Sequence, residues 1–580
     1  MKKNVLAVSI AAMIGGLGFA GVASAGSAFF NTSGTAVTAD GKAVSATNPA
    51  LAIADELAVV PEGVGHILVV PYFTTQEGNV SLLNIVNTDT VNGKAVKLRY
   101  RGAANSDDIY DITVLLSPGD VWSANVSQAN GVSTLTTNDK SCTLPANVNA
   151  AFSGGRTKGG SDAQTLEGYI EILNMADIPA TLAADATGAL STVENPLYKA
   201  IKHVNGVAPC STVPSQLKDV VAVATTISNA ATAATSLAAN EWNGRGFNYP
   251  SGGLMANWSI VNLSKAGSFT GTATAVAAID SGASTDRAIG NLVFSPQDSA
   301  FQPADAAAVT ARVHPAFLTA DPLLAGGVYK DGTIAQPVIQ ASLYDFPDLS
   351  TPYVTNPATL GNALAQAEAL SAALATKSVT NEYMTSASVG FATDWTFSMP
   401  ARRYNVALDY NGATAKEVVY AGTLNVAAAL PATAVVAGAV GTYFTTNNTQ
   451  LSADKSQICV TPGALNYYDT EEQGAAGGSY VISPQPIGAK LAFCGETSVL
   501  TFNNATGSVL GAKIATQNIV TKQNATTTFT DGWMSVQTPG NTDGGATIGL
   551  PVIGHAFAKA LGSSANLGGI WAHRTNRAGL

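Results

Sequence analysis

The chain has 580 residues, of which 12% are charged and 46% hydrophobic, and its formal net charge is −10. This hydrophobic content excludes a disordered chain, because disorder needs few apolar residues and a high net charge. The excess of acidic side chains argues against a nucleic-acid partner, since binding to phosphates depends on cationic contacts. The length is that of two or three domains.

The first 25 residues have the pattern of a signal peptide. Lys2 and Lys3 form a basic start, residues 5–19 are apolar, and an Ala-x-Ala pattern precedes cleavage between Ala25 and Gly26. The alternative is a membrane anchor, although a spanning helix needs roughly 20 apolar residues. There is neither a twin-arginine pair nor a cysteine at the cleavage point. The pattern therefore predicts Sec export to the cell surface, the extracellular space or the periplasm.

The next segments predict a mainly β fold. Residues 26–62 are rich in Ser, Thr, Ala and Gly and are typical of a linker or arm. Short strand-like runs between Gly, Pro and Asn turns predict an Ig-like β-sandwich domain over residues 63–213. The run at 94–101 alternates between an apolar and a basic face, formed respectively by Val96, Leu98 and Tyr100 and by Lys97, Arg99 and Arg101. One face of such strands must be buried, and Trp122 is a candidate core residue.

The rest of the chain repeats this patterning. It predicts a β-rich region with helical insertions over 214–400 and a C-terminal β-rich domain over 401–580. Further strands are expected at 168–174, 257–262, 268–279, 387–391, 396–399, 499–503 and 518–521, and helices at 216–240 and 360–377. The uncharged stretch 418–452 is interrupted by Pro431 and diluted with Gly, Thr and Asn. It indicates β structure, so no transmembrane segment is expected after signal removal.

Four cysteines fit an exported chain, namely Cys142, Cys210, Cys459 and Cys494. Three connectivities are possible, and we expect the local pairs Cys142–Cys210 and Cys459–Cys494 because each brackets a turn-rich excursion. The alternative is a metal site, but there is no Cys-x-x-Cys, and the five histidines have no ligand spacing.

Acidic clusters are the weak candidates for a Ca²⁺ site. They comprise Asp107, Asp108 and Asp111 in one segment and Asp469, Glu471 and Glu472 in another. Carboxylates are Ca²⁺ ligands, but neither cluster matches an EF-hand loop. The alternative is solvated turns. No cofactor other than Ca²⁺ is indicated.

Catalytic motifs are not evident in the sequence. It contains no Gly-x-Ser-x-Gly, His-Glu-x-x-His or phosphate loop. A dispersed Ser-His-Asp triad or a pair of glycosidase carboxylates remains possible, because neither has a fixed spacing. The expectation is a protein that is not an enzyme.

The tryptophans leave two alternatives open. An exposed cluster of Trp242, Trp258 and Trp395 would favour stacking on a carbohydrate, whereas aromatic residues in strands more often belong to the core.

Several segments resemble a family of exported proteobacterial proteins described as putative cell-surface proteins, for which no activity is assigned. The matching pieces are residues 67–73, 116–122, 381–383, 393–395 with Pro400, 468–472 and 549–554. The resemblance implies a location in the cell envelope or on the cell surface. The composition is also similar to that of surface-layer proteins, apart from the four cysteines.

Three functions are therefore considered. The first is a structural surface protein that self-associates into a layer or filament. The second is an adhesin or polysaccharide-binding protein, and the third is a secreted hydrolase.

Overall fold

The computed structural model describes residue 54 and much of the chain from 56 to 577. The described ranges are 54, 56–155, 157–183, 190–210, 246–265, 267–280, 284–287, 289–290, 329–330, 333–334, 363–408, 418–420, 443–474, 481–483, 491–503, 507–523, 527–543, 546–561 and 566–577. The predicted signal peptide, residues 1–25, lies outside them.

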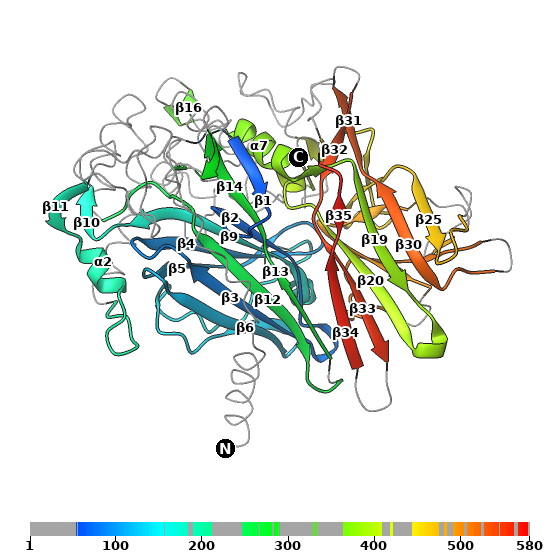
Figure 1. The fold of residues 1–580 in the computed structure, drawn as a ribbon, viewed down its shortest axis with the longest axis horizontal. Coiled ribbons are helices and arrows are strands. Elements are labelled where there is room, and N and C mark those ends of the chain that lie inside the picture. Colours follow the sequence, from blue (N-terminus) through cyan, green and yellow to red (C-terminus); the bar gives the residue numbers. More distant parts are fainter. Residues whose placement is uncertain are drawn as a thin grey trace.

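Two antiparallel sheets form a first sandwich (Figure 1). Sheet 1 contains, in spatial order, β1 (Glu56–Val60), β14 (Thr274–Asp280), β2 (Ile67–Thr74), β9 (Glu167–Ile178), β4 (Gly93–Gly102), β5 (Asp108–Leu116) and β8 (Cys142–Leu144), and β15 (Ser284–Arg287) pairs with β14. Sheet 2 contains β13 (Gly267–Thr272), β12 (Leu254–Asn262), β3 (Val80–Asn87), β6 (Val121–Ala129) and β7 (Val132–Thr136). The prediction of a mainly β, sandwich-type fold is confirmed.

The core of this sandwich lies between its two sheets. The apolar face of β4, including Leu98 and Tyr100, packs there with Leu83 and Ile85 of β3. Trp122 of β6 is fully buried in the same cluster, as expected from the sequence. Alternation at period two puts one face of each strand into this core.

The strands of the first sandwich come from a wider part of the chain than predicted. β12 pairs with β3 in a register that runs from Leu254↔Asn87 to Val261↔Val80. β14 lies between β1 and β2, and β1 falls inside the segment 26–62 that was predicted as a linker or arm. Sheets 1 and 2 therefore each contain strands from both sides of the boundary predicted at 213/214. Local patterning identifies strands but not their distant partners.

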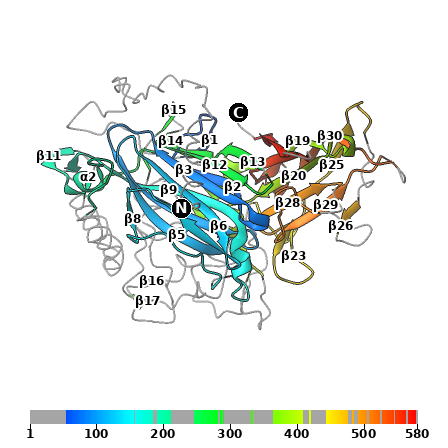
Figure 2. The same ribbon diagram turned by 90° about the horizontal axis from the view of Figure 1, so that it is seen from below.

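A second sandwich is built from the C-terminal part of the chain (Figure 2). Sheet 3 contains β26 (Val481–Ser483), β29 (Thr516–Val520), β28 (Thr497–Phe502), β20 (Phe391–Ser398), β33 (His555–Leu561) and β34 (Asn566–Ala572). Sheet 4 contains β25 (Leu465–Asp469), β30 (Asp531–Gln537), β19 (Ser378–Met384) and β35 (Arg574–Thr575). β28 and β29 run parallel, while the other neighbours are antiparallel.

The second core is rich in aromatic side chains. Phe397 stacks on Phe493 with ring centroids 4.2 Å apart, and Tyr383 stacks on Phe502 at 5.0 Å. β19 and β20 precede residue 400 but pair with β30 and β33. The boundary predicted at 400/401 therefore also falls within a sandwich.

Shorter strands complete the fold. They are β10 (Thr181–Ala183) with β11 (Leu190–Glu194), β16 (Tyr329–Lys330) with β17 (Thr333–Ile334), β21 (Val406–Leu408) with β22 (Val418–Tyr420), β18 (Ala375–Thr376) with β32 (Ala546–Pro551) and β31 (Pro539–Asp543), and β23 (Thr449–Leu451) with β24 (Ile458–Val460) and β27 (Phe493–Cys494).

Helices are scarce among the described residues, as predicted. α7 (Ala363–Leu374) lies within the expected segment 360–377, and its Leu370 and Leu374 pack on the outer face of sheet 1. α2 (Pro196–Ile201) is capped by Asn195, whose side chain accepts the Leu197 amide hydrogen. The helix predicted at 216–240 lies outside the described residues.

One predicted strand differs at its start. Residues 387–391 begin as a 3₁₀ turn, η5 (Ala387–Val389), and become extended from Phe391. Gly390 has a φ of 65°, a left-handed conformation that glycine adopts readily and that ends the turn.

Both expected disulfides are present. Cys142 is bonded to Cys210 in the first sandwich, and Cys459 to Cys494 in the second. In the part of the chain that the structure describes, no helix has the length and apolarity needed to cross a membrane.

Candidate functional site

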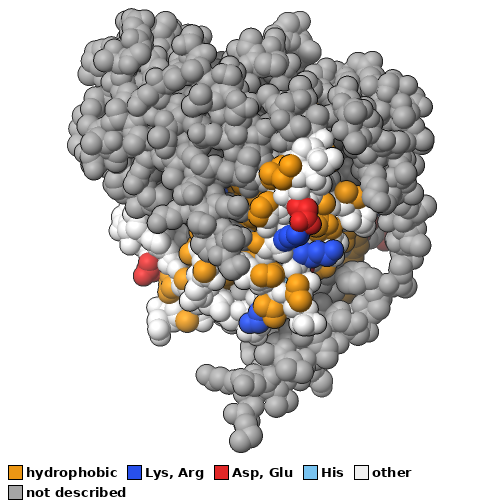
Figure 3. All heavy atoms as spheres, turned by 90° about the vertical axis from the view of Figure 1, so that its left-hand side faces the viewer, with side chains coloured by type: hydrophobic (Ala, Val, Ile, Leu, Met, Phe, Trp, Pro, Cys, Tyr) orange, Lys and Arg blue, Asp and Glu red, His pale blue; other side chains and the backbone are white. Residues whose placement is uncertain are grey.

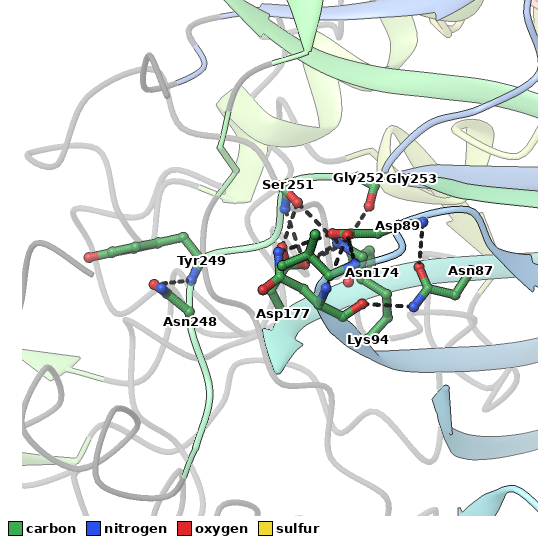
Figure 4. A network of polar contacts seen from close by, with 12 residues as sticks. Asn87, Asp89, Lys94, Asn174, Asp177, Asn248, Tyr249, Ser251, Gly252 and Gly253 are labelled. Atoms are coloured by element: carbon green, nitrogen blue, oxygen red, sulfur yellow. Dashed lines mark hydrogen bonds and ion pairs between the residues drawn. The ribbon is translucent and has the colours of Figure 1, made fainter. Parts of the chain in front are cut away.

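A buried lysine is the centre of a polar cluster at one end of the first sandwich (Figure 4). The Nζ of Lys94 donates to Asp177 Oδ1 at 2.7 Å, to Asp89 Oδ2 at 3.0 Å and to Ser251 Oγ at 3.0 Å. The side chains of Lys94, Asp89 and Asp177 are 0%, 12% and 5% exposed. All three ammonium hydrogens therefore have acceptors, and two of these are carboxylates. We call these four residues the Lys94 cluster.

Regular structure positions each member of the Lys94 cluster. Lys94 is the second residue of β4 and lies directly opposite Asp177 of β9. Asp89 lies in the β3–β4 turn, where its Oδ1 accepts the backbone amides of Val91 and Asn92 at 2.8 and 3.0 Å. Ser251 belongs to the segment before β12 and donates its hydroxyl to Asp177 Oδ2 at 2.5 Å.

Burial and charge oppose each other in this cluster. Burial raises the pKa of Asp177, and the attraction of Lys94 does not fully offset it. Burial also favours a raised pKa for Asp89, but Lys94 and the turn amides outweigh it, so that this pKa is lowered. Burial alone would lower the pKa of Lys94, but the two carboxylates raise it overall. The two carboxyl groups thus differ in acidity.

A second ion cluster lies where the two sandwiches meet. We call it the junction cluster and define it as Arg101, Glu171, Arg402, Arg403 and Glu496. Glu171 of β9 accepts Arg101 Nε at 3.1 Å and also pairs with Arg403. Arg402 pairs with Glu496 at 2.6 Å, and both side chains are fully buried. Three of these residues thus come from the second half of the described chain.

Burial and charge also oppose each other in the junction cluster. Burial raises the pKa of Glu171, but Arg403 and Arg101 outweigh it and hold this pKa below its usual value. For Glu496, burial dominates and the pKa is raised despite the two neighbouring arginines. The guanidinium of Arg403 also lies 4.0 Å from the ring centroid of Tyr404.

Backbone groups also join the two sandwiches. The amides of Glu496 and Thr497 donate to Ala103 O at 2.8 and 3.1 Å. The Lys513 amide donates to the buried Glu167 carboxylate at 2.7 Å. The apolar core of the first sandwich also includes Phe557 of β33. The two sandwiches therefore share a continuous interior.

An exposed aromatic pair lies on the outer face of sheet 4. Trp533 of β30 is 41% exposed and stacks on Tyr468 of β25, with ring centroids 4.6 Å apart. The two residues are opposite one another in register, and Glu382 of β19 lies on the other side of Trp533. Glu382 is exposed. We call Trp533, Tyr468 and Glu382 the aromatic row.

The acidic candidates for Ca²⁺ binding lie in two different sandwiches. Asp111 pairs with Lys97 at 2.8 Å and Asp108 lies 3.8 Å from Arg101. Burial raises the pKa of Asp111 to about 6 despite the attraction of Lys97. Asp107 is buried beside them in the β4–β5 connection.

In the second segment, Asp469 Oδ1 accepts the amides of Glu471 and Gln473, each at 2.8 Å. Glu471 and Glu472 are exposed. Searching the described ranges finds no group of three or more His, Cys, Asp or Glu side chains that could hold a metal ion.

Two of the three tryptophans considered for carbohydrate stacking are core residues. Trp258 and Trp395 are 2% and 0% exposed. Trp242 lies outside the described residues. Among the described tryptophans, Trp533 and Trp571 are exposed, and both lie in strands that the sequence analysis did not identify.

Sequence reasoning missed both ion clusters. The sequence did contain one indication of buried ion pairs, namely the basic face of β4 followed by the acidic residues 108 and 111 of β5. The other partners, such as Glu171 and Arg403, are 70 or more residues away from that face and have no motif that links them to it.

A small pocket lies between the sandwiches, beside β12 and β33. Its cavity volume is about 20 Å³, and its lining includes Glu77, Asn79, Lys265 and Lys559. This volume is close to the space that one water molecule needs.

Comparison with protein-family models, curated proteins and solved structures gives no match for this chain.

Proposed function

We propose that this chain is an exported structural protein of the cell surface that self-associates into a layer or filament. The observation that carries the proposal is the junction cluster, which joins two sandwiches through buried charges contributed by both. Removing one partner of such a pair is strongly destabilising, so the two halves are held in one arrangement. A rigid unit suits an assembly in which each copy must repeat the same contacts.

Export is supported by two features. The N-terminal pattern is that of a signal peptide, with cleavage after Ala25. The two disulfides fit an oxidising compartment outside the cytoplasm. The resemblance to exported cell-surface proteins agrees with this location.

The end of the molecule around α2 is the surface at which we expect self-association. Val193, Val204 and Val207 are 57%, 61% and 50% exposed there. Figure 3 faces this end and shows apolar side chains gathered among a few charged ones. Beside them, β10 and β11 pair only with each other among the described strands. Exposed apolar side chains and strand edges are both features through which copies of a chain associate.

Sedimentation velocity of the mature chain tests this proposal. The wild type is expected to form large species, and a double Val204→Glu, Val207→Glu variant is expected to sediment as a monomer. Leu263→Glu is the matched control. Leu263 is similarly exposed, at 47%, but it follows the C-terminal end of β12 and is not part of the surface around α2. A wild-type chain that stays monomeric at all concentrations would overturn the proposal.

The second candidate function is polysaccharide binding, and the aromatic row favours it. An exposed indole stacks on the apolar face of a sugar, and adjacent carboxylate and hydroxyl groups bind its hydroxyls. Thr380 and Ser535, which hydrogen-bond to each other at 3.0 Å, lie two residues along the same strands. Retention of the wild type on immobilised envelope polysaccharide tests this candidate, with Trp533→Ala as the variant that should lose retention. Equal retention of both proteins would rule out this surface.

A further inference from the structure

The pair formed by Lys94 and Asp177 has a geometry suited to a covalent bond. The two residues are register partners on adjacent strands, and Lys94 Nζ lies 2.7 Å from Asp177 Oδ1. Both backbones are held inside sheet 1, so strand pairing keeps the two side chains beside each other. Groups held together in this way react as if at effective concentrations of about 10⁵–10⁸ M.

Burial favours a neutral product over the ion pair. The Lys94 side chain has no exposed surface, and that of Asp177 is only 5% exposed. Keeping an ammonium and a carboxylate out of water is costly even when they are paired. An amide carries no charge, so its formation removes this cost from the folded state. Burial also raises the pKa of Asp177, which favours the protonated carboxyl group that an amine can attack, whereas the two carboxylates raise the pKa of Lys94 and make its ammonium group harder to deprotonate.

Asp89 supplies a carboxylate that can relay protons. Its Oδ2 accepts a hydrogen bond from the same Lys94 Nζ at 3.0 Å, while its Oδ1 is fixed by two backbone amides. A base in this position can take a proton from the ammonium group and expose the nitrogen lone pair. Ser251 holds the Asp177 carboxyl group through its hydroxyl, which donates to Oδ2 at 2.5 Å.

We propose that Lys94 and Asp177 condense to an intramolecular amide that cross-links β4 to β9, with Asp89 relaying the proton. Asp89 first accepts one ammonium proton and passes it to the Asp177 carboxylate, and the Lys94 nitrogen then attacks Cγ of the protonated Asp177 carboxyl group. A Cγ–N bond forms and one Cγ–O bond breaks. The departing oxygen leaves as water with two of the three ammonium protons, and the third stays on the amide nitrogen. Asp89 ends as a carboxylate, and no oxidant or other reactant is consumed.

The pair of Lys97 and Asp111 is a built-in comparison. Its Nζ–Oδ1 distance is 2.8 Å and its lysine is equally buried. Lys97, however, lies opposite Thr113, so Asp111 is its diagonal neighbour rather than its direct partner. The proposal therefore assigns the amide to Lys94 and not to Lys97. It does not depend on the proposed function.

Mass spectrometry of the purified full chain tests the proposal. After reduction and denaturation, the wild type should be lighter than its free-lysine form by the mass of one water molecule. Trypsin should fail to cut after Lys94 and should release a branched peptide that joins residues 43–97 to residues 159–199. Cleavage after Lys94, a full-mass chain, or water loss mapped to any other pair would overturn it.

Two variants complete the experiment. Lys94→Arg keeps the positive charge between the two carboxylates but cannot form the amide, so its mass should equal that calculated from its sequence. Asp89→Asn keeps the shape of the turn and removes the base, and we expect amide formation to slow by about 10²-fold or more. Unchanged formation in Asp89→Asn would remove Asp89 from the mechanism.

Discussion

Replacing Glu171 with Gln tests whether the junction cluster holds the two sandwiches together. Gln has the same shape, so the substitution removes charge without opening a cavity. It leaves Arg101 and Arg403 without the carboxylate that both contact, and the Glu171 side chain is only 5% exposed. Loss of one partner from a buried ion pair costs about 3–5 kcal/mol. We therefore expect Glu171→Gln to lower the free energy of unfolding by this amount.

Glu194→Gln is the matched control for this experiment. Glu194 pairs with Lys199 at 2.6 Å, but the two side chains are 73% and 62% exposed. Exposed ion pairs contribute only about 0.2–1 kcal/mol because water and salt screen them. Guanidinium chloride unfolding followed by tryptophan fluorescence measures both variants, since Trp122 and Trp395 report on the two cores. Similar losses for the two variants would refute the reasoning.

The pH dependence provides a second check on the same substitution. In the folded state the pKa of Glu171 lies below its unfolded value because Arg403 and Arg101 outweigh the effect of burial. Its contribution is therefore complete above the unfolded pKa of about 4.3 and is lost as the pH falls toward the folded value. The stability gap between wild type and Glu171→Gln should shrink as the pH is lowered from 6 to about 3. A gap that is constant over this range would show that charge is not the cause.

Three further predictions follow from other parts of the molecule. The Cys142→Ser, Cys210→Ser double variant should lose about 4 kcal/mol of stability in chemical unfolding, because the bridge spans 68 residues of sequence; a loss below about 1 kcal/mol would contradict the loop-entropy argument. Burial lowers the pKa of His555 to about 4, so the unfolded chain binds more protons between pH 6.5 and 4. The melting temperature of His555→Phe should therefore fall less than that of wild type as the pH is lowered through this window. Parallel plots of melting temperature against pH for the two proteins would contradict this prediction. When polysaccharide is added, the decrease in tryptophan fluorescence should be smaller for Trp533→Ala than for wild type, whereas Trp571→Ala should show the wild-type decrease. Equal decreases for the two variants would exclude the aromatic row as the binding surface.

The strand content could be predicted from the sequence because alternation depends only on local residues. The run 94–101 forms β4 as expected, and its apolar residues Leu98 and Tyr100 enter the core. The fate of its basic face could not be predicted. Arg101 is fully buried because Glu171, 70 residues away, and Arg403, from the second half of the chain, meet at the same place. No local pattern encodes such a meeting.

The domain boundaries and the aromatic row could not be predicted from the sequence for the same reason. β12 completes a sheet begun by β3, across the boundary expected at 213/214. Trp258 is buried because it lies on the face of sheet 2 that packs into the first core, whereas Trp533 is exposed on the outer face of sheet 4. Exposure depends on which face a sheet presents to its neighbours, and this is fixed only by the tertiary fold. The disulfides were predictable because each pair closes within its own sandwich.

Electron microscopy of the purified mature chain tests the proposed structural role most directly. Negatively stained samples would be imaged with Ca²⁺ and again after chelation with EDTA. The account predicts ordered sheets or filaments in the sample with Ca²⁺. Monodisperse single particles under both conditions would contradict the account.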